Sequence, residues 1–128
     1  AFLFSIIGYK TPSFNFDIAV EKVKKKGIFP ILAHPERYMY FHGKYGKYPS
    51  LKADGVLFQL NLLSLEPAAY GDSVQKIAAK LLNDGLIDFV GTDVHSVRQL
   101  NLLKEVKVSK KTLEQLLPII ERTIQTFY

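Results

Sequence analysis

The sequence lacks cysteine and tryptophan, contains only three histidines, and has no long apolar run. Without cysteine, a disulfide scaffold, a thiolate-ligated zinc or iron–sulfur site and thiol catalysis are excluded, so any metal must be held by His, Asp or Glu. The apolar runs are much shorter than the ~20 residues of a membrane-spanning helix. Residues 1–8 are apolar but have no basic flank or cleavage-site pattern, which argues against a signal peptide. We therefore expect a cytoplasmic chain without a membrane span.

The composition is typical of a folded protein with one core. Of the 128 residues, 48% are hydrophobic and 23% are charged, which excludes a mainly disordered chain. The net charge of +5 raises the question of an anionic partner. However, the densest basic run, residues 22–26, precedes Gly27 at the expected end of a helix, where cations are favourable. We favour a solvated helix end over a partner-binding patch, and we expect no nucleic-acid partner.

Short apolar runs alternate with longer amphipathic stretches, and glycine or proline marks each change of period. This alternation predicts an α/β fold with about four parallel strands and flanking helices. The expected strands are residues 2–7, 28–33, 56–60 and 86–91. The expected helices run from Asn15 to before Gly27 and over residues 50–54, 73–83, 96–103 and 109–127.

Polar residues follow three of these strands at their carboxyl ends, where parallel α/β folds usually carry their chemistry. Asp93 and His95 are two residues apart, and on an extended backbone both side chains would face the same way and could share a metal. Alternatively, Asp93 caps the next helix. His34 precedes Pro35, which favours an extended backbone at that position and would aim the imidazole. Alternatively, His34 is a buried histidine whose ring is hydrogen-bonded to a carbonyl.

Arg37 carries a fork of donors that suits a phosphate, although a surface salt bridge would also explain it. Two further features could bear on the site. His42 is expected to be a solvated loop residue. The aromatic segment that follows His34 could stack on an aromatic substrate or simply pack beneath its own loop; it contains Tyr38, Tyr40, Phe41, Tyr45 and Tyr48.

Four motifs together resemble a known family, the bacterial manganese-dependent tyrosine-protein phosphatases of the polymerase and histidinol phosphatase (PHP) superfamily. They are residues 30–38 (PILAHPERY), 59–61 (QLN) with 64–65 (SL), 70–71 (YG) and 87–96 (IDFVGTDVHS). This family is associated with capsular and exopolysaccharide synthesis. The resemblance implies a distorted (β/α)7 barrel, of which residues 1–128 would be a single partial domain, the C-terminal half.

The resemblance also implies roles for individual residues. His34, Asp93 and His95 correspond to metal ligands, most simply for Mn, with Fe or Zn as alternatives. Arg37 corresponds to a phosphate-binding residue and Arg98 lies near a second one, while Asn61 and Gln59 would line the site. Arg37 and Asp93 would take part in hydrolysis of phosphotyrosine on a partner protein, expected to be a bacterial tyrosine kinase.

Two departures from the family pattern matter. The family's N-terminal His-x-His half does not occur in this sequence, and Leu3 stands where the family has a bridging glutamate. Three explanations follow: a C-terminal fragment of a longer phosphatase, with the isolated chain inactive; a divergent homologue that serves as a non-catalytic interaction module; or two chains that associate as a homo-oligomer to complete a barrel. A small-molecule phosphoesterase such as a histidinol phosphatase would share the same ligands.

Overall fold

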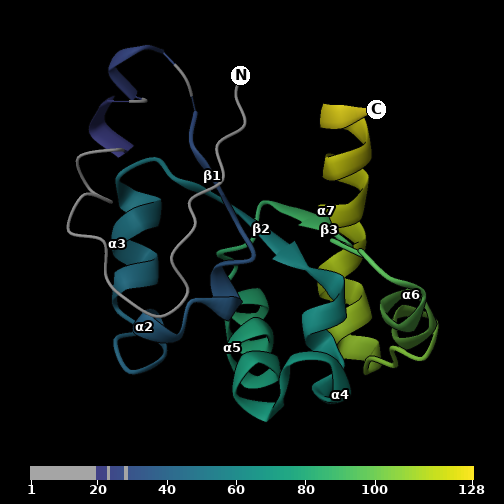
Figure 1. The fold of residues 1–128 in the computed structure, drawn as a ribbon. Coiled ribbons are helices and arrows are strands. Elements are labelled where there is room, and N and C mark those ends of the chain that lie inside the picture. The colour runs from purple at the N-terminus through teal and green to yellow at the C-terminus, as the bar shows by residue number, and fades with distance from the viewer. Residues whose placement is uncertain (1–19, 23, 28) are drawn as a thin grey trace.

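The computed structural model describes residues 20–128 apart from 23 and 28, and its centre is a parallel sheet (Figure 1). The strands β1 (Ile31–Ala33), β2 (Leu57–Asn61) and β3 (Phe89–Gly91) lie in the order β1-β2-β3. Both pairs are parallel, with Ala33 opposite Gln59 and Asn61 opposite Gly91. The predicted α/β class is confirmed.

Helices connect the strands, as the alternation of the sequence predicts. The segment after β1 contains the 3-10 helix η1 (Pro35–Arg37), α2 (Met39–His42) and α3 (Lys47–Ala53). The segment after β2 contains the 3-10 helix η2 (Leu62–Leu65), α4 (Pro67–Tyr70) and α5 (Asp72–Asn83), and β3 is followed by α6 (Val97–Lys104) and α7 (Lys110–Phe127). In the described part of the chain, no helix is both long enough and apolar enough to cross a membrane.

The strands are shorter than predicted where neighbouring turns use their backbone groups. The predicted strand 86–91 is reduced to β3 because Leu86 N donates to Leu81 O (3.1 Å) and so closes the turn after α5. In the predicted strand 28–33, residues 29 and 30 precede β1, although Leu57 N still bonds Pro30 O (2.9 Å). The expected strand 2–7 and the helix start at Asn15 lie outside the described residues, so a fourth strand remains a prediction.

Several helix ends follow the sequence signals. Ser96 and Ser109 cap α6 and α7 with their side chains, as the spacing predicts for Ser109. The basic run also lies at a helix end, because residues 20–22 and 24–25 are helical and a turn follows at residues 26–27. The lysines described in this run are exposed, in agreement with a solvated helix end.

The core lies between the sheet and its helices and is unusually aromatic on the β1 side. Phe58 of β2 is fully buried, and Tyr48 of α3 packs edge-on against it with ring centroids 6.0 Å apart. Tyr38 and Phe41 are also buried, so the aromatic segment after His34 is part of the core. The packing interpretation is therefore confirmed over substrate stacking. This core fixes η1, which carries Arg37, to the carboxyl ends of the strands.

Candidate functional site

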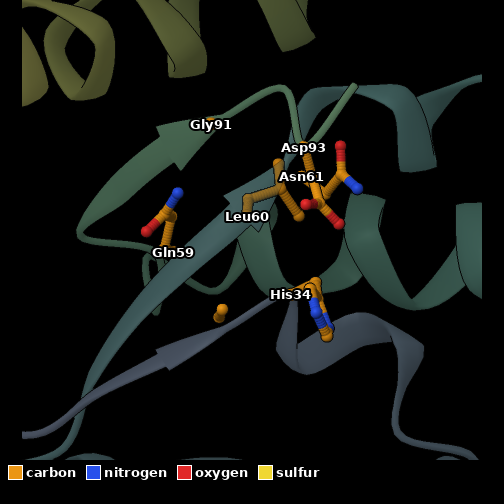
Figure 2. A pocket seen from close by; sticks show the side chains of 7 residues that line it. His34, Gln59, Leu60, Asn61, Gly91 and Asp93 are labelled. Atoms are coloured by element: carbon orange, nitrogen blue, oxygen red, sulfur yellow. The ribbon is translucent and has the colours of Figure 1, made fainter. Parts of the chain in front are cut away.

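The three strands end at one edge of the sheet, where a pocket of about 170 Å³ lies (Figure 2). Its walls come from all three strands and from the residues directly after them: Ala33, His34, Gln59, Leu60, Asn61, Gly91 and Asp93. His34 and Asp93, predicted as metal ligands from distant parts of the sequence, thus line the same pocket. Gln59 and Asn61 line it too, as expected.

His34 links the end of β1 to the pocket. Its backbone N–H donates to Gln59 O (2.8 Å), and its ring stacks on Tyr38 with centroids 5.6 Å apart. Burial, and then the charge of Arg37, lower the pKa of His34, which favours the neutral imidazole that can bind a metal. The expected extended backbone is wrong: φ is 41° and ψ is 58°, a left-handed conformation that lets Pro35 begin η1 immediately.

Asp93 and His95 are also held differently from the prediction. Asp93 has a φ of 50°, so the backbone turns instead of running extended. His95 Nδ1 nevertheless lies 3.4 Å from Asp93 Oδ1, because the ring folds back and donates to Asp93 O (2.7 Å). Since a carbonyl only accepts, Nδ1 carries a proton, and in a neutral imidazole the lone pair would then be on Nε2. The cap of α6 is Ser96, which excludes the capping role considered for Asp93.

His34 and Asp93 share a conformational property that supports a functional reading. Among the described residues other than glycine, they are the two with positive φ. Side chains with a Cβ rarely adopt this region, and such strain concentrates at functional sites. His34 directly follows β1, Asp93 lies two residues after the end of β3, and both line the same pocket. The backbone outliers and the predicted ligands therefore coincide.

Arg37 lies beside the pocket and contacts Asp93, one of the residues that line it. Its Nη1 donates to Asp93 Oδ2 (3.3 Å), and its guanidinium carbon lies 4.1 Å from the centroid of the Tyr70 ring. The side chain of Arg37 is 19% exposed and that of Asp93 is 38% exposed, so the pair is partly accessible to solvent. The salt bridge considered from the sequence therefore exists, and its acidic partner is a candidate site residue.

Asn61 presents a buried amide to the pocket. Its Oδ1 accepts from Leu63 N (3.0 Å), which fixes the amide orientation and caps η2. The opposite atom, Nδ2, is buried and has no hydrogen-bond partner within the part of the chain described. A buried N–H₂ without an acceptor is costly, and an oxyanion in the pocket would satisfy it.

Glu36 is the functional-site residue that sequence reasoning missed. It is fully buried, and its Oε1 accepts from Asn61 N (3.0 Å) and Ser64 Oγ (2.8 Å), which ties η1 to the end of β2. Burial raises the pKa of Glu36 to about 7, while the hydrogen bond from Ser64 opposes that shift. A charged residue between Pro35 and Arg37 reads as exposed in sequence, and only its long-range partners show otherwise.

Two other predicted positions lie away from the pocket. Arg98 is exposed in the first turn of α6 and does not belong to the pocket lining. His42 is not a solvated loop residue: it ends α2, is half-buried, and its Nε2 lies 2.7 Å from Glu36 O. His42 therefore stabilises the turn that carries Glu36.

His34, Asp93 and His95 are the right types of ligand for a divalent cation, but too few of them converge on one point. Two imidazoles and a carboxylate are ligands that Mn, Fe and Zn accept. Yet no group of three or more His, Asp or Glu side chains in the described residues is arranged to hold a metal ion. The His95 side chain is 74% exposed and does not belong to the pocket lining. These residues therefore form an incomplete cation site.

The fold and the pocket define a parallel α/β protein with its site at the strand ends. The family model for capsular polysaccharide synthesis, CpsB/CapC, matches residues 10–117. The chain therefore belongs to the CpsB/CapC family, and the resemblance seen in the sequence is confirmed at this level. No curated protein sequence matches the chain.

A solved structure supports the same fold. A chain from the crystal structures of YwqE from Bacillus subtilis and CpsB from Streptococcus pneumoniae, described as metal-dependent tyrosine phosphatases, has a TM-score of 0.66 and 20% sequence identity. The match covers 93% of this chain and 53% of that chain. The present chain thus spans about half the length of the solved structure that it matches.

Proposed function

We propose that this chain is the C-terminal part of a metal-dependent protein-tyrosine phosphatase that acts in capsular or exopolysaccharide synthesis. The observation that carries the proposal is the shared pocket: His34, Asn61 and Asp93 line it, and Arg37 contacts Asp93 beside it. Membership in the CpsB/CapC family supports this reading. The description of the matched structures as metal-dependent tyrosine phosphatases suggests the reaction.

The candidate site residues divide into two roles. Arg37 and Asn61 bind the phosphate group, Arg37 through its guanidinium and Asn61 through its buried Nδ2. His34, Asp93 and His95 hold a divalent cation, with Mn as the first choice and Fe or Zn as alternatives. When bound, such an ion stabilises negative charge on phosphate oxygens and lowers the pKa of water. Arg98 remains a prediction for a second phosphate contact.

We further propose that the domain is part of a distorted (β/α)7 PHP barrel. The three parallel strands would form one section of its wall, and strands outside them would supply the remaining metal donors. The length of the matched structure, about twice that of this chain, supports this arrangement. An incomplete donor set among the described residues is what such a division would leave, and the isolated chain would then be inactive.

The substrate is proposed to be phosphotyrosine on a partner protein, most simply a bacterial tyrosine kinase in the cytoplasm. A different observation favours a second function. The Arg37–Asp93 ion pair occupies the carboxylate that a cation would need, as expected for a non-catalytic module that binds a phosphorylated partner. A small-molecule phosphoesterase such as a histidinol phosphatase is a third reading.

One assay separates these functions. The polypeptide as its gene encodes it is incubated with a phosphotyrosine peptide or with histidinol phosphate, in Mn²⁺ or in EDTA. We expect Mn²⁺-dependent release of phosphate from the peptide, lost in Asp93→Asn and kept in Asp54→Asn, an exposed aspartate outside the pocket lining. Peptide binding without turnover would support the binding module. Faster turnover of histidinol phosphate would support the small-molecule enzyme.

A further inference from the structure

A closed circuit of contacts surrounds Arg37 beside the pocket. The Arg37 guanidinium stacks on Tyr70 at 4.1 Å, and Gln99 Nε2 donates to Tyr70 Oη (3.5 Å). Gln99 Oε1 in turn accepts from His95 N (2.6 Å). The Arg37–Asp93 ion pair closes the circuit. Tyr70 and Asp93 contact the guanidinium, and Gln99 links Tyr70 to the backbone of His95.

The orientation of Gln99 follows from its hydrogen bonds. Its backbone N–H donates to Ser96 Oγ (3.1 Å), so the residue is fixed in the first turn of α6. Because the side-chain oxygen takes the N–H of His95, the amide nitrogen must face Tyr70. Tyr70 ends α4, directly before Gly71 with its φ of 91°, and α4 packs against α6. Tyr70 and Gln99 thus support each other from neighbouring helices.

The Tyr70 ring, 4.1 Å from the guanidinium carbon, restrains the side chain of Arg37. An arginine side chain has several rotatable bonds, and ordering it at the moment of binding weakens the binding of an anion. A ring against the guanidinium removes part of that freedom beforehand, and the planar fork of N–H donors of an arginine has the geometry that suits phosphate.

We propose that Tyr70 and Gln99 are positioning residues that pre-orient Arg37 to bind a phosphate monoester. This inference rests on the proposed function, in which Arg37 contacts the phosphate, and it adds two residues that sequence reasoning assigned no role. Tyr70 acts directly through its ring. Gln99 acts indirectly, because it holds Tyr70 and the backbone of His95 in register.

The test measures the affinity of the full chain for phenyl phosphate in EDTA by NMR titration. We expect Tyr70→Leu to bind about fivefold to tenfold more weakly, as loss of a stacked cation–π contact implies. Gln99→Leu should weaken binding about twofold to threefold, and Tyr70→Phe less, because Phe keeps the ring. Tyr40→Leu is the matched control: its ring also carries a cation, Lys44 Nζ at 4.6 Å, but away from the pocket lining.

A second readout separates positioning from a general loss of structure. The Arg37 Nε–Hε resonance should carry a ring-current shift in the native chain and in Tyr70→Phe, and should lose it in Tyr70→Leu. If Tyr70→Leu unfolds, Gln99→Leu decides: unchanged affinity and an unchanged Arg37 resonance in that variant would overturn the proposal.

Failure of this inference is distinguishable from failure of the proposed function. Native affinity in Tyr70→Leu together with weak binding in Arg37→Gln would refute the positioning role and leave Arg37 as a phosphate ligand. Native affinity in Arg37→Gln would instead remove the phosphate role of Arg37, and with it both proposals for this residue.

Discussion

The guanidinium of Arg37 donates to the carboxylate of Asp93, Nη1 to Oδ2 at 3.3 Å, across 56 positions of sequence. The pair joins the segment after β1 to the segment after β3. It also places a positive charge beside the carboxylate that a cation in the pocket would use. Ion pair and metal ligation at Asp93 therefore compete.

This competition makes a prediction for metal binding. Because the described residues do not assemble three donors, Mn²⁺ should bind the chain with a Kd well above about 1 μM. Arg37→Gln should bind Mn²⁺ about threefold more tightly since it removes the competing charge, and Asp93→Asn should bind it more weakly. Isothermal titration calorimetry measures all three. Submicromolar binding by the native chain, or weaker binding by Arg37→Gln, would contradict this account.

The buried carboxyl of Glu36 predicts a pH-dependent stability. The pKa of Glu36 is about 7 in the folded chain, against 4.5 for an ordinary glutamate such as that of the unfolded chain. Between pH 4.5 and pH 7, the folded state therefore keeps a proton that the unfolded state releases. The contribution of Glu36 to the free energy of unfolding is fully present below pH 4.5. It is lost as the pH rises from 4.5 through 7, by about 3 kcal/mol in total.

Glu36→Gln should remove that dependence. Relative to the native chain, the free energy of unfolding of the variant should rise between pH 5 and pH 8 by an amount on the order of 2–3 kcal/mol. Urea denaturation at both pH values gives the difference, and Glu66→Gln, at a half-exposed glutamate, serves as the control. An equal difference between native and variant at pH 5 and pH 8 would show that Glu36 does not titrate in this way.

The hydroxyl of Tyr48 supports the turn that carries Arg37. Tyr48 is fully buried, and its Oη donates to Pro35 O (2.9 Å) at the start of η1. Tyr48→Phe leaves that carbonyl buried without this donor, which should cost about 1–2 kcal/mol in the free energy of unfolding. Tyr40→Phe, whose hydroxyl makes an exposed bond to Lys44, should cost less than about 0.5 kcal/mol. Equal losses in the two variants would exclude a specific role for the Pro35 bond.

Gly91 leaves room for Gln59 at the pocket. Gly91 pairs with Asn61 of β2. A Cβ at position 91 would collide with the side-chain amide of Gln59, which lies two residues before Asn61. Since the far end of a glutamine moves easily, Gly91→Ala should cost only about 1 kcal/mol and should shift the Gln59 amide resonances. Gly46→Ala, with open space around it, is the control. Native Gln59 shifts in Gly91→Ala would mean that the amide does not occupy this space.

The order of the three described strands and of the longer helices, and the positions where these strands end, were predictable from the sequence, whereas the short helices α2 and α4 were not. Hydrophobic periodicity and glycine at the turns are local properties, so β2, α5 and α7 appear close to their predicted bounds. The same reasoning placed His34, Asn61 and Asp93 at one edge of a parallel sheet, and they do line one pocket. Local rules failed at the backbone of His34 and Asp93, where φ is positive.

The sequence by itself determined an α/β chain with chemically active residues after its strands. The period of apolar residues and the residue types at strand ends are properties of short segments, so they can be recognised without the tertiary structure. Only the tertiary structure decided that Glu36 is buried, that Arg37 pairs with Asp93, and that Tyr70 and Gln99 support the guanidinium. These relationships join segments far apart in the chain, and their strength depends on burial and orientation, which arise only when the sheet and its helices pack together.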